Sequence, residues 1–416
     1  MWWSCCVLMA CTVPALSAAG AMLRQENAAM LYYQAFLLCP PHEAFDNGDA
    51  PDRDAFVAVM ADGPFRTRLS VGGEALSWRL RHYLSRYGDV ITLTESASRI
   101  GHCDWAMPDG PPGRELRVQL RDWLRSVAFL YGADIHGLLS DDAYDTALTR
   151  CMTLRRMAAH VAEDPGRQYW APLLADEYAF RFMRQVLNQM PADRGTLLRM
   201  QADFGPVPSF VEALPDWIEA QFGQALTTAH SDGELLASLR EELAEAAADS
   251  ETRSEALEHT DEQLMAMIRE SCSPFVDDII ATLNSGASYG QVYASLGAQA
   301  EAVRQAGVAN PLILVDVQTL PQLAQGFHLM KTSYMAYHNA VANAIELHLI
   351  RERAGRLPRS LPEGLLKDPF SGADFEYEAI QTGFLFRCPT TPAGREEPSE
   401  YRFAVETREW VMYEDR

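Results

Sequence analysis

The feature that most constrains the fold is a stretch of about a hundred residues from Glu115 onward in which apolar side chains recur every three or four positions. This spacing gathers them on one face of an α-helix. The recurring positions are Leu116, Leu120, Trp123, Leu124 and Val127, and farther along Leu148, Met152, Leu154 and Met157. The stretch is too long for one globular helix, so it predicts several helices packed on one another.

Two helix boundaries are predicted inside this stretch. Tyr131, Gly132 and Ala133 are expected to end one helix, because glycine is common just past a helix end. The segment from Ser140 to Ala143 is expected to cap the next helix. Helix pairs joined by such turns resemble tetratricopeptide-type hairpins, although a fixed repeat of about 34 residues is missing. The predicted fold is therefore a mainly α-helical, hairpin-repeat-like body.

Segments rich in proline and glycine divide the chain, the clearest being residues 99–113 and 205–216. We predict an N-terminal leader at 1–21, a helical region at 22–112 that ends in a Gly/Pro linker, a helical hairpin region at 113–204, an acidic helical region at 205–340 and a small α/β module at 341–416. Within the acidic region, Asp232 to Arg269 is predicted to be a solvated helix rather than a binding surface. Leu312 to Val317 fits either a short strand or a buried helix start.

The C-terminal module has the most complete local signals. A long helix is predicted from Leu320 to Arg353, and prolines 358 and 362 then force a turn or an extended path. The segment KDPFSG, residues 367–372, opens a turn. Alternating aromatic residues predict a hairpin that packs back on the helix. These residues are Phe375, Tyr377, Phe384 and Phe386, and segments 401–405 and 409–413 are expected to add edge strands.

This order of a helix end, Leu-Pro turns, a DP-aromatic-x-G turn and short strands resembles the globular half of type II secretion pseudopilins. The resemblance implies a bacterial cell envelope protein with a small α/β ending. Two features depart from that family. First, neither a methylation motif nor a long apolar helix lies directly before the module. Second, residues 388–400, CPTTPAGREEPSE, stand in place of the family's acidic calcium loop. A filament subunit is therefore not expected.

A second resemblance begins at Cys103, Asp104 and Trp105. These residues, followed by a Gly/Pro linker and helices rich in arginine and leucine, resemble uncharacterised exported proteins of planctomycete-type bacteria. That family has no activity to transfer. What the resemblance implies is export to the envelope.

The first 21 residues contain no charged side chain and end in Ala19, Gly20 and Ala21, which favours a cleaved signal peptide. A membrane or lipid anchor and a buried N-terminal helix remain open alternatives. Removal of this leader leaves five cysteines, Cys39, Cys103, Cys151, Cys272 and Cys388, and an odd number cannot pair completely. Cys39 and Cys103 are candidates for a disulfide, whereas small buried thiols are the expected state for most of the five.

The net charge of −22 argues against nucleic-acid binding and against contact with anionic lipid surfaces, so membrane contact is expected at most through residues 1–21. No catalytic, cofactor-binding or metal residue is predicted. His102, Cys103 and Asp104 are contiguous, and adjacent side chains rarely close on one metal ion. The acidic pairs 141/142, 277/278 and 396/397 are expected by chance in a chain with 57 acidic residues. The serine in the segment Gly286 to Gly290 is expected to lie in a helix–helix turn.

These observations predict a non-catalytic protein of the periplasm or cell envelope, which acts as a scaffold or interaction module for other envelope proteins. One alternative is a secretion-system accessory factor that docks through its C-terminal module. The other is an uncharacterised envelope hydrolase, which would need a cleft where several polar groups converge.

Overall fold

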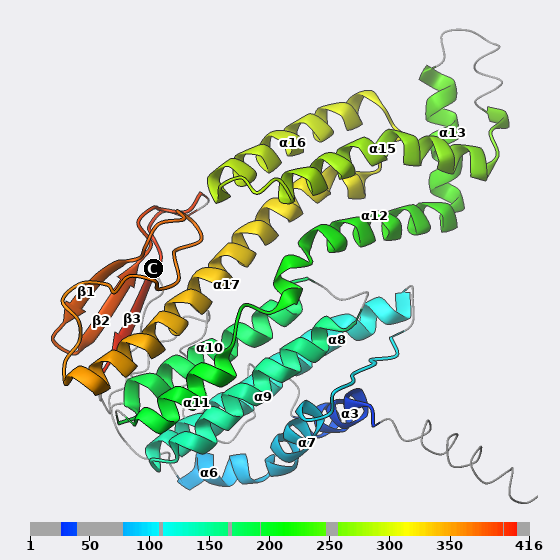
Figure 1. The fold of residues 1–416 in the computed structure, drawn as a ribbon. Coiled ribbons are helices and arrows are strands. Elements are labelled where there is room, and N and C mark those ends of the chain that lie inside the picture. Colours follow the sequence, from blue (N-terminus) through cyan, green and yellow to red (C-terminus); the bar gives the residue numbers. More distant parts are fainter. Residues whose placement is uncertain are drawn as a thin grey trace, which may run out of the picture. The chain divides into compact units, whose positions relative to one another are not determined.

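The computed structural model describes residues 26–39, 78–107, 111–164, 169–191, 193–246, 257–393 and 395–405. These residues form a mainly α-helical body with a small antiparallel sheet near the C-terminus, which confirms the predicted fold class (Figure 1). The leader at 1–21 and the expected strand at 409–413 lie outside the described residues. None of the described helices is long and apolar enough to cross a membrane.

The chain divides into two compact units. The N-terminal unit contains residues 1–67 and 74–167, and the C-terminal unit contains residues 68–73 and 168–416. The division falls inside the range 113–204, which the sequence pattern grouped as one helical region.

The N-terminal unit is built from helices that pack in pairs. Its described helices are α3 (Ala28–Leu38), α6 (Trp78–Ser85), α7 (Gly88–Ser98), α8 (Pro111–Ser140) and α9 (Tyr144–Ala162). Helix α3 packs on α7, while α9 packs on both α7 and α8. The side chain of Asn27 caps α3 by accepting a hydrogen bond from the Ala29 amide at 3.1 Å. The same oxygen accepts from the amide of Asp104, which fastens the loop after α7 to the start of α3.

One of the two predicted helix boundaries in this unit is wrong. The other lies at the predicted residues, but a backbone turn forms it and not a side-chain cap. Helix α8 continues through Tyr131, Gly132 and Ala133 to Ser140, because Tyr131 and Ala133 are fully buried and core packing outweighs the local cost of a glycine. The next turn does lie at residues 141–143. It is closed by a backbone hydrogen bond of 2.8 Å from Ala143 to Leu138, and α9 begins without a side-chain cap.

The C-terminal unit is organised around α17 (Val315–Ala354), which contacts most of the other elements (Figure 1). Its remaining described helices are α10 (Trp170–Gln189), α11 (Arg194–Phe204), the 3-10 helix η1 (Ser209–Glu212), α12 (Leu214–Ser231), α13 (Gly233–Ala246), α15 (Asp261–Leu283) and α16 (Tyr289–Ala309). The predicted long helix is confirmed, and Leu312 to Val317 is not a strand. Leu312, Ile313 and Leu314 are buried in the turn that leads into the helix, which begins at the exposed Val315.

A three-stranded antiparallel sheet packs on the second half of α17. Its order is β1 (Glu376–Ile380), β2 (Gly383–Arg387) and β3 (Glu400–Ala404). Phe384 lies opposite Phe403, and both side chains are fully buried. The Ala404 amide donates to Asn188 Oδ1 at 3.0 Å, so β3 is also tied to α10. The predicted hairpin and its packing against the helix are thus present.

Two asparagines one turn apart on α17 hold the segment that leads into the sheet. Asn343 Nδ2 donates to the carbonyl of Leu366 at 2.8 Å, and Asn343 Oδ1 accepts from the amide of the same residue at 2.9 Å. Asn339 Nδ2 donates to the carbonyl of Lys367 at 2.8 Å. Because these bonds satisfy backbone groups that no strand pairs with, they fix where the module begins on the helix.

His348 on α17 is a buried titratable group beneath the sheet. Its ring lies edge-on to Phe384, with ring centroids 5.7 Å apart, and only 3% of the residue is exposed. Nε2 has no hydrogen-bond partner among the described residues. Burial, helped by the charge of Arg351, lowers the pKa of His348 to about 4. The ring is therefore neutral in the folded protein at neutral pH.

We expect the C-terminal unit to lose stability in acid through His348. The unfolded chain takes up a proton near pH 6.5, whereas the folded ring takes it up near pH 4, so stability present above pH 6.5 falls by up to about 3 kcal/mol as the pH approaches 4. His348→Leu removes this proton uptake and should reduce the slope, while His328, whose pKa burial also lowers to about 4, keeps its own contribution. Urea unfolding at a series of pH values measures the slope. Equal slopes for the parent protein and the variant would contradict the assignment.

Candidate functional site

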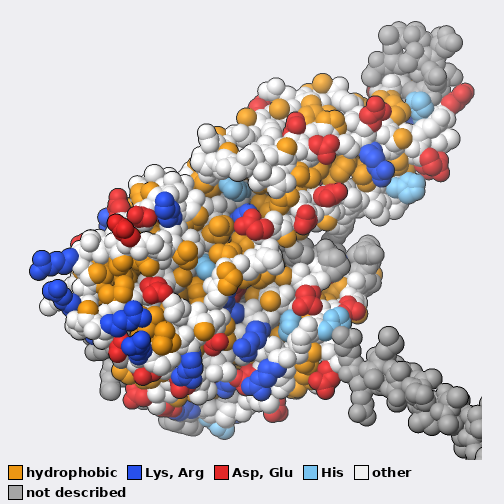
Figure 2. Space-filling view, viewed as in Figure 1, with side chains coloured by type: hydrophobic (Ala, Val, Ile, Leu, Met, Phe, Trp, Pro, Cys, Tyr) orange, Lys and Arg blue, Asp and Glu red, His pale blue; other side chains and the backbone are white. Residues whose placement is uncertain are grey.

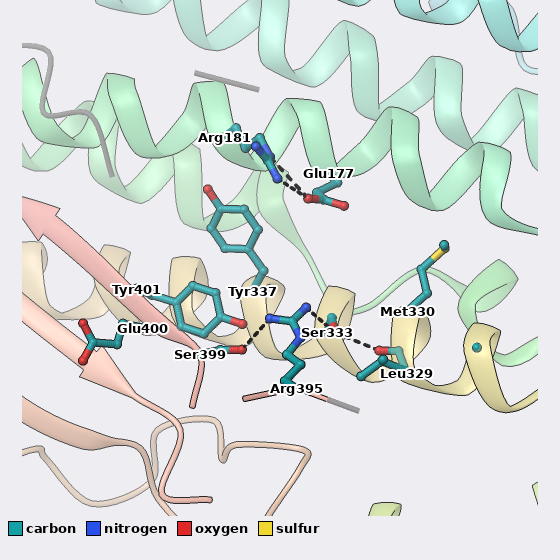
Figure 3. Close-up of a pocket in the computed structure, with 11 residues that line it drawn as sticks. Glu177, Arg181, Leu329, Met330, Ser333, Tyr337, Arg395, Ser399, Glu400 and Tyr401 are labelled. Carbon is teal, nitrogen blue, oxygen red and sulfur yellow. Dashed lines mark hydrogen bonds and ion pairs between the residues drawn. The ribbon is translucent and has the colours of Figure 1, made fainter. Parts of the chain in front are cut away.

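A cavity of about 400 Å³ in the C-terminal unit lies between α10, α17 and the segment that enters β3 (Figure 3). Its lining residues are Glu177 and Arg181 from α10, Gly326, Leu329, Met330, Ser333 and Tyr337 from α17, and Arg395, Ser399, Glu400 and Tyr401 from the end of the chain. Three segments that are far apart in sequence therefore build one site. Its volume is within the range of about 300–1,000 Å³ that small-molecule and cofactor pockets occupy.

The loop between β2 and β3 forms one wall of the cavity. The Cys388 amide donates to the Ser399 carbonyl at 2.9 Å, which closes the loop at its base. The Tyr289 hydroxyl at the start of α16 donates to the Ala393 carbonyl at 2.9 Å. Burial raises the pKa of Tyr289 to about 12, so the hydroxyl keeps its proton for this bond. The loop is anchored at its base and at its middle.

Arg395 is an exposed residue of this loop whose side chain lines the cavity. Its Nη1 donates to Ser399 Oγ at 2.9 Å, and its Nη2 donates to Ser333 Oγ at 3.1 Å (Figure 3). Ser333 Oγ in turn donates to the Leu329 carbonyl at 2.8 Å. Among the described residues, the hydrogen-bond partners of the guanidinium are thus neutral hydroxyls, and no carboxylate forms an ion pair with it.

The other charged residues of the lining are paired. Arg181 Nη2 lies 2.7 Å from Glu177 Oε1, one turn away on α10, on the wall opposite Arg395 (Figure 3). Glu400 is bound by Arg387 at 2.6 Å, and this contact raises the pKa of the Arg387 guanidinium. The lining itself carries two arginines and two glutamates, and Glu400 is paired with Arg387 from outside the cavity. Among these charged residues of the described lining, Arg395 is the one that forms no ion pair.

Aromatic rings form a third side of the cavity. Tyr337 and Tyr401 stack with centroids 5.3 Å apart and an interplanar angle of 19°. Both are buried, whereas Met330 at the rim is 38% exposed. Stacked rings and a flexible thioether offer an apolar surface that adapts to different side chains.

The sequence interpretation named no site residue, and the residues it weighed do not converge on this cavity. His102 and Asp104 are exposed, while Cys103 and Trp105 between them are buried, so the four side chains alternate in direction. Within the part of the chain that the structure describes, no group of three His, Cys, Asp or Glu residues is placed to hold a metal ion.

The segment Gly286 to Gly290 matches the Gly-x-Ser-x-Gly pattern of serine hydrolases, yet its setting is that of a helix cap. In those enzymes the serine lies on a strand-to-helix turn. Here Ser288 follows α15 and caps α16, and its Oγ donates to Gln291 Oε1 at 2.9 Å. The expected helix–helix turn is confirmed.

The five cysteines of the described residues are all buried and free. Cys39 and Cys103, the candidates for a disulfide, are therefore separate thiols. Burial raises the pKa of each to about 12. A thiol with so high a pKa is a poor nucleophile, and these residues act as small apolar core side chains.

The cavity residues escaped sequence reasoning because each is ordinary alone. Arg395 lies in the loop between β2 and β3, beside the acidic pair 396/397, and only the fold brings it to Ser333. Comparison of the chain with protein-family models, with curated proteins and with solved structures gave no match.

Proposed function

We propose that this chain is a non-catalytic binding protein of the bacterial cell envelope, whose C-terminal unit binds a segment of a partner protein in the cavity around Arg395. The observation that carries the proposal is the preformed pocket. Its walls come from α10, α17 and the loop before β3, and its positive charge has no carboxylate partner among the described residues. A concave site with a few polar groups at fixed positions is typical of ligand recognition.

The polar groups of the cavity are suited to binding rather than to bond cleavage. A serine nucleophile needs an adjacent base that accepts its proton. Ser333 Oγ donates a hydrogen bond to the Leu329 carbonyl and accepts one from the guanidinium of Arg395, which is always charged and cannot act as a base. An arrangement of this kind attracts an anion, which supports binding over hydrolysis.

Location in the envelope rests on the N-terminal leader and on the resemblance to pseudopilins and to exported planctomycete-type proteins. The partners we propose are other envelope proteins. The loop from the C-terminal module forms a wall of the cavity, so docking to a secretion apparatus would use this same site.

The proposal is tested by blocking the cavity. Gly326 lines it, and a Cβ added there meets no atom within 4 Å, so Gly326→Trp should fill the space while α17 stays folded. We expect a photo-crosslinker at Met330 to give discrete adducts with envelope proteins in the native cells. Gly326→Trp should abolish these adducts.

Gly223→Trp is the matched control, because Gly223 is an exposed helical glycine on α12 with equal free space. It should leave the adducts unchanged. Adducts that persist in Gly326→Trp, or that are recovered only with cytoplasmic proteins, would refute the proposal.

A further inference from the structure

We infer that the cavity recognises the C-terminal carboxylate of a partner polypeptide, with Arg395 as its anchor. This inference rests on the proposed function and assigns the chemical class of the ligand. Four features of the site lead to it: its unpaired charge, its free hydrogen-bond donors, its size and the field of the rest of the molecule.

The charge of the site fits a single negative group. Glu177 is paired with Arg181 and Glu400 with Arg387, so Arg395 supplies the one charge without a carboxylate partner among the described lining residues. A carboxylate would balance it. A phosphate group, with a charge near −2, would leave negative charge uncompensated beside two glutamates.

The site has enough free hydrogen-bond donors to bind both oxygens of a carboxylate. The guanidinium has five N–H groups in one plane, and the two serine hydroxyls use one from each terminal nitrogen. Ser399 Oγ accepts from Arg395, and its own proton has no acceptor among the described residues although Ser399 is only 4% exposed. Remaining guanidinium N–H groups and this hydroxyl can therefore donate together to one carboxylate, the geometry for which arginine is preferred.

The size of the cavity favours the end of a chain. Its 400 Å³ lies near the lower limit of about 300–1,000 Å³ for ligand pockets. A terminal residue can enter with its carboxylate at Arg395 and its side chain against Tyr337, Tyr401 and Met330. A segment that passes through would need room for the chain on both sides of the carboxylate.

The electrostatic field of the protein disfavours ligand segments that carry several acidic residues. The net charge of −22 repels ligands that carry several negative charges. Basic side chains gather over the sheet end of the C-terminal unit on the face shown in Figure 2, whereas acidic ones are prominent over α15 and α16. Arg353 in the last turn of α17 and Arg356 and Arg359 in the segment after it are exposed. A lone carboxylate is attracted locally without a polyanion being favoured.

The test uses the full chain and a synthetic library of short peptides with randomised C-terminal residues, prepared both as free acids and as C-terminal amides. We expect affinity selection to enrich free acids, and fluorescence anisotropy to show binding weakened about tenfold or more by amidation. Arg395→Ala should weaken binding about as much, and Arg395→Lys less, because an ammonium keeps the charge but loses the planar donors.

Ser399→Ala should weaken binding about threefold to tenfold through loss of one donor. Arg304→Ala is the matched control for charge, because Arg304 is exposed and paired with Glu301 on α16. It should bind like the parent protein, and thermal melting verifies that every variant is folded.

The outcomes separate the two proposals. If peptides bound equally as acids and amides, and Gly326→Trp abolished this binding, the carboxylate inference would be overturned while the proposed function stands. Enrichment of C-terminal amides that contain Asp or Glu would show that the site binds an acidic side chain, and this result would also overturn the carboxylate inference. A lack of enrichment in both forms would overturn both proposals.

Discussion

Asp368→Ala should lower the free energy of unfolding of the C-terminal unit by about 3 kcal/mol, because it leaves buried donors without an acceptor. Asp368 is fully buried in the turn between α17 and β1. Its carboxylate accepts from the amides of Phe370 at 3.2 Å and Ser371 at 3.0 Å, and from Ser371 Oγ at 2.6 Å. Its backbone also pairs with that of Ala373 at 2.8 Å. One side chain thus organises the whole turn.

The expected loss is measured by urea unfolding and by hydrogen exchange of peptides from β2, whose amides should exchange faster in the variant. Asp374→Ala is the matched control, since Asp374 is exposed six residues away in the same segment, and it should change stability by less than about 0.5 kcal/mol. Asp368→Asn keeps one acceptor oxygen and should be intermediate. Equal stability of the Asp368 and Asp374 alanine variants would contradict this role of the carboxylate.

The C-terminal module was predictable because its signals are local. Asp368 and Gly372 fix the turn, the latter with φ of 71°, and alternating aromatic residues fix which face of the hairpin is buried. The turn and the hairpin of β1 and β2 follow one another directly in the sequence. Their preferences therefore need no distant partner to take effect.

Helix ends decided by tertiary packing were not predictable from local preference. Gly132 lies in the interior of α8, where a glycine costs about 1 kcal/mol relative to alanine. The burial of Tyr131 and Ala133 against other helices outweighs this cost, and that burial depends on contacts distant in sequence. The division of the chain into two units likewise depends on contacts between residues that are distant in sequence.

The cavity was unpredictable for a related reason. Glu177, Tyr337 and Arg395 occupy separate elements, and none belongs to a motif with fixed spacing. Arg395 stands beside Glu396 and Glu397 in the segment 388–400, and only the folded chain brings it to Ser333 on α17.

In the N-terminal unit, Trp105→Ala should have the largest effect, a loss of about 3–5 kcal/mol. Trp105 is 3% exposed and stacks on Tyr32 with centroids 5.5 Å apart. Its Nε1 donates to the His160 carbonyl at 2.8 Å, and its own carbonyl accepts from the Tyr33 hydroxyl at 2.8 Å. The ring thus joins α3, α9 and the loop between α7 and α8, so its removal opens a cavity where three elements meet.

Trp105→Phe separates packing from hydrogen bonding. It keeps an aromatic ring but loses the donor to His160, so it should cost about 1–2 kcal/mol. His102→Ala is the control within the same loop, because that side chain is exposed while its backbone carbonyl still accepts from the Ala28 amide at 3.0 Å. Calorimetry gives the stabilities, and hydrogen exchange of α3 should rise in the order His102→Ala, Trp105→Phe, Trp105→Ala. If α3 exchanged at the parent rate in Trp105→Ala, the helix would be held by its contacts with α7 alone, and the ring would not be the element that joins it to α9.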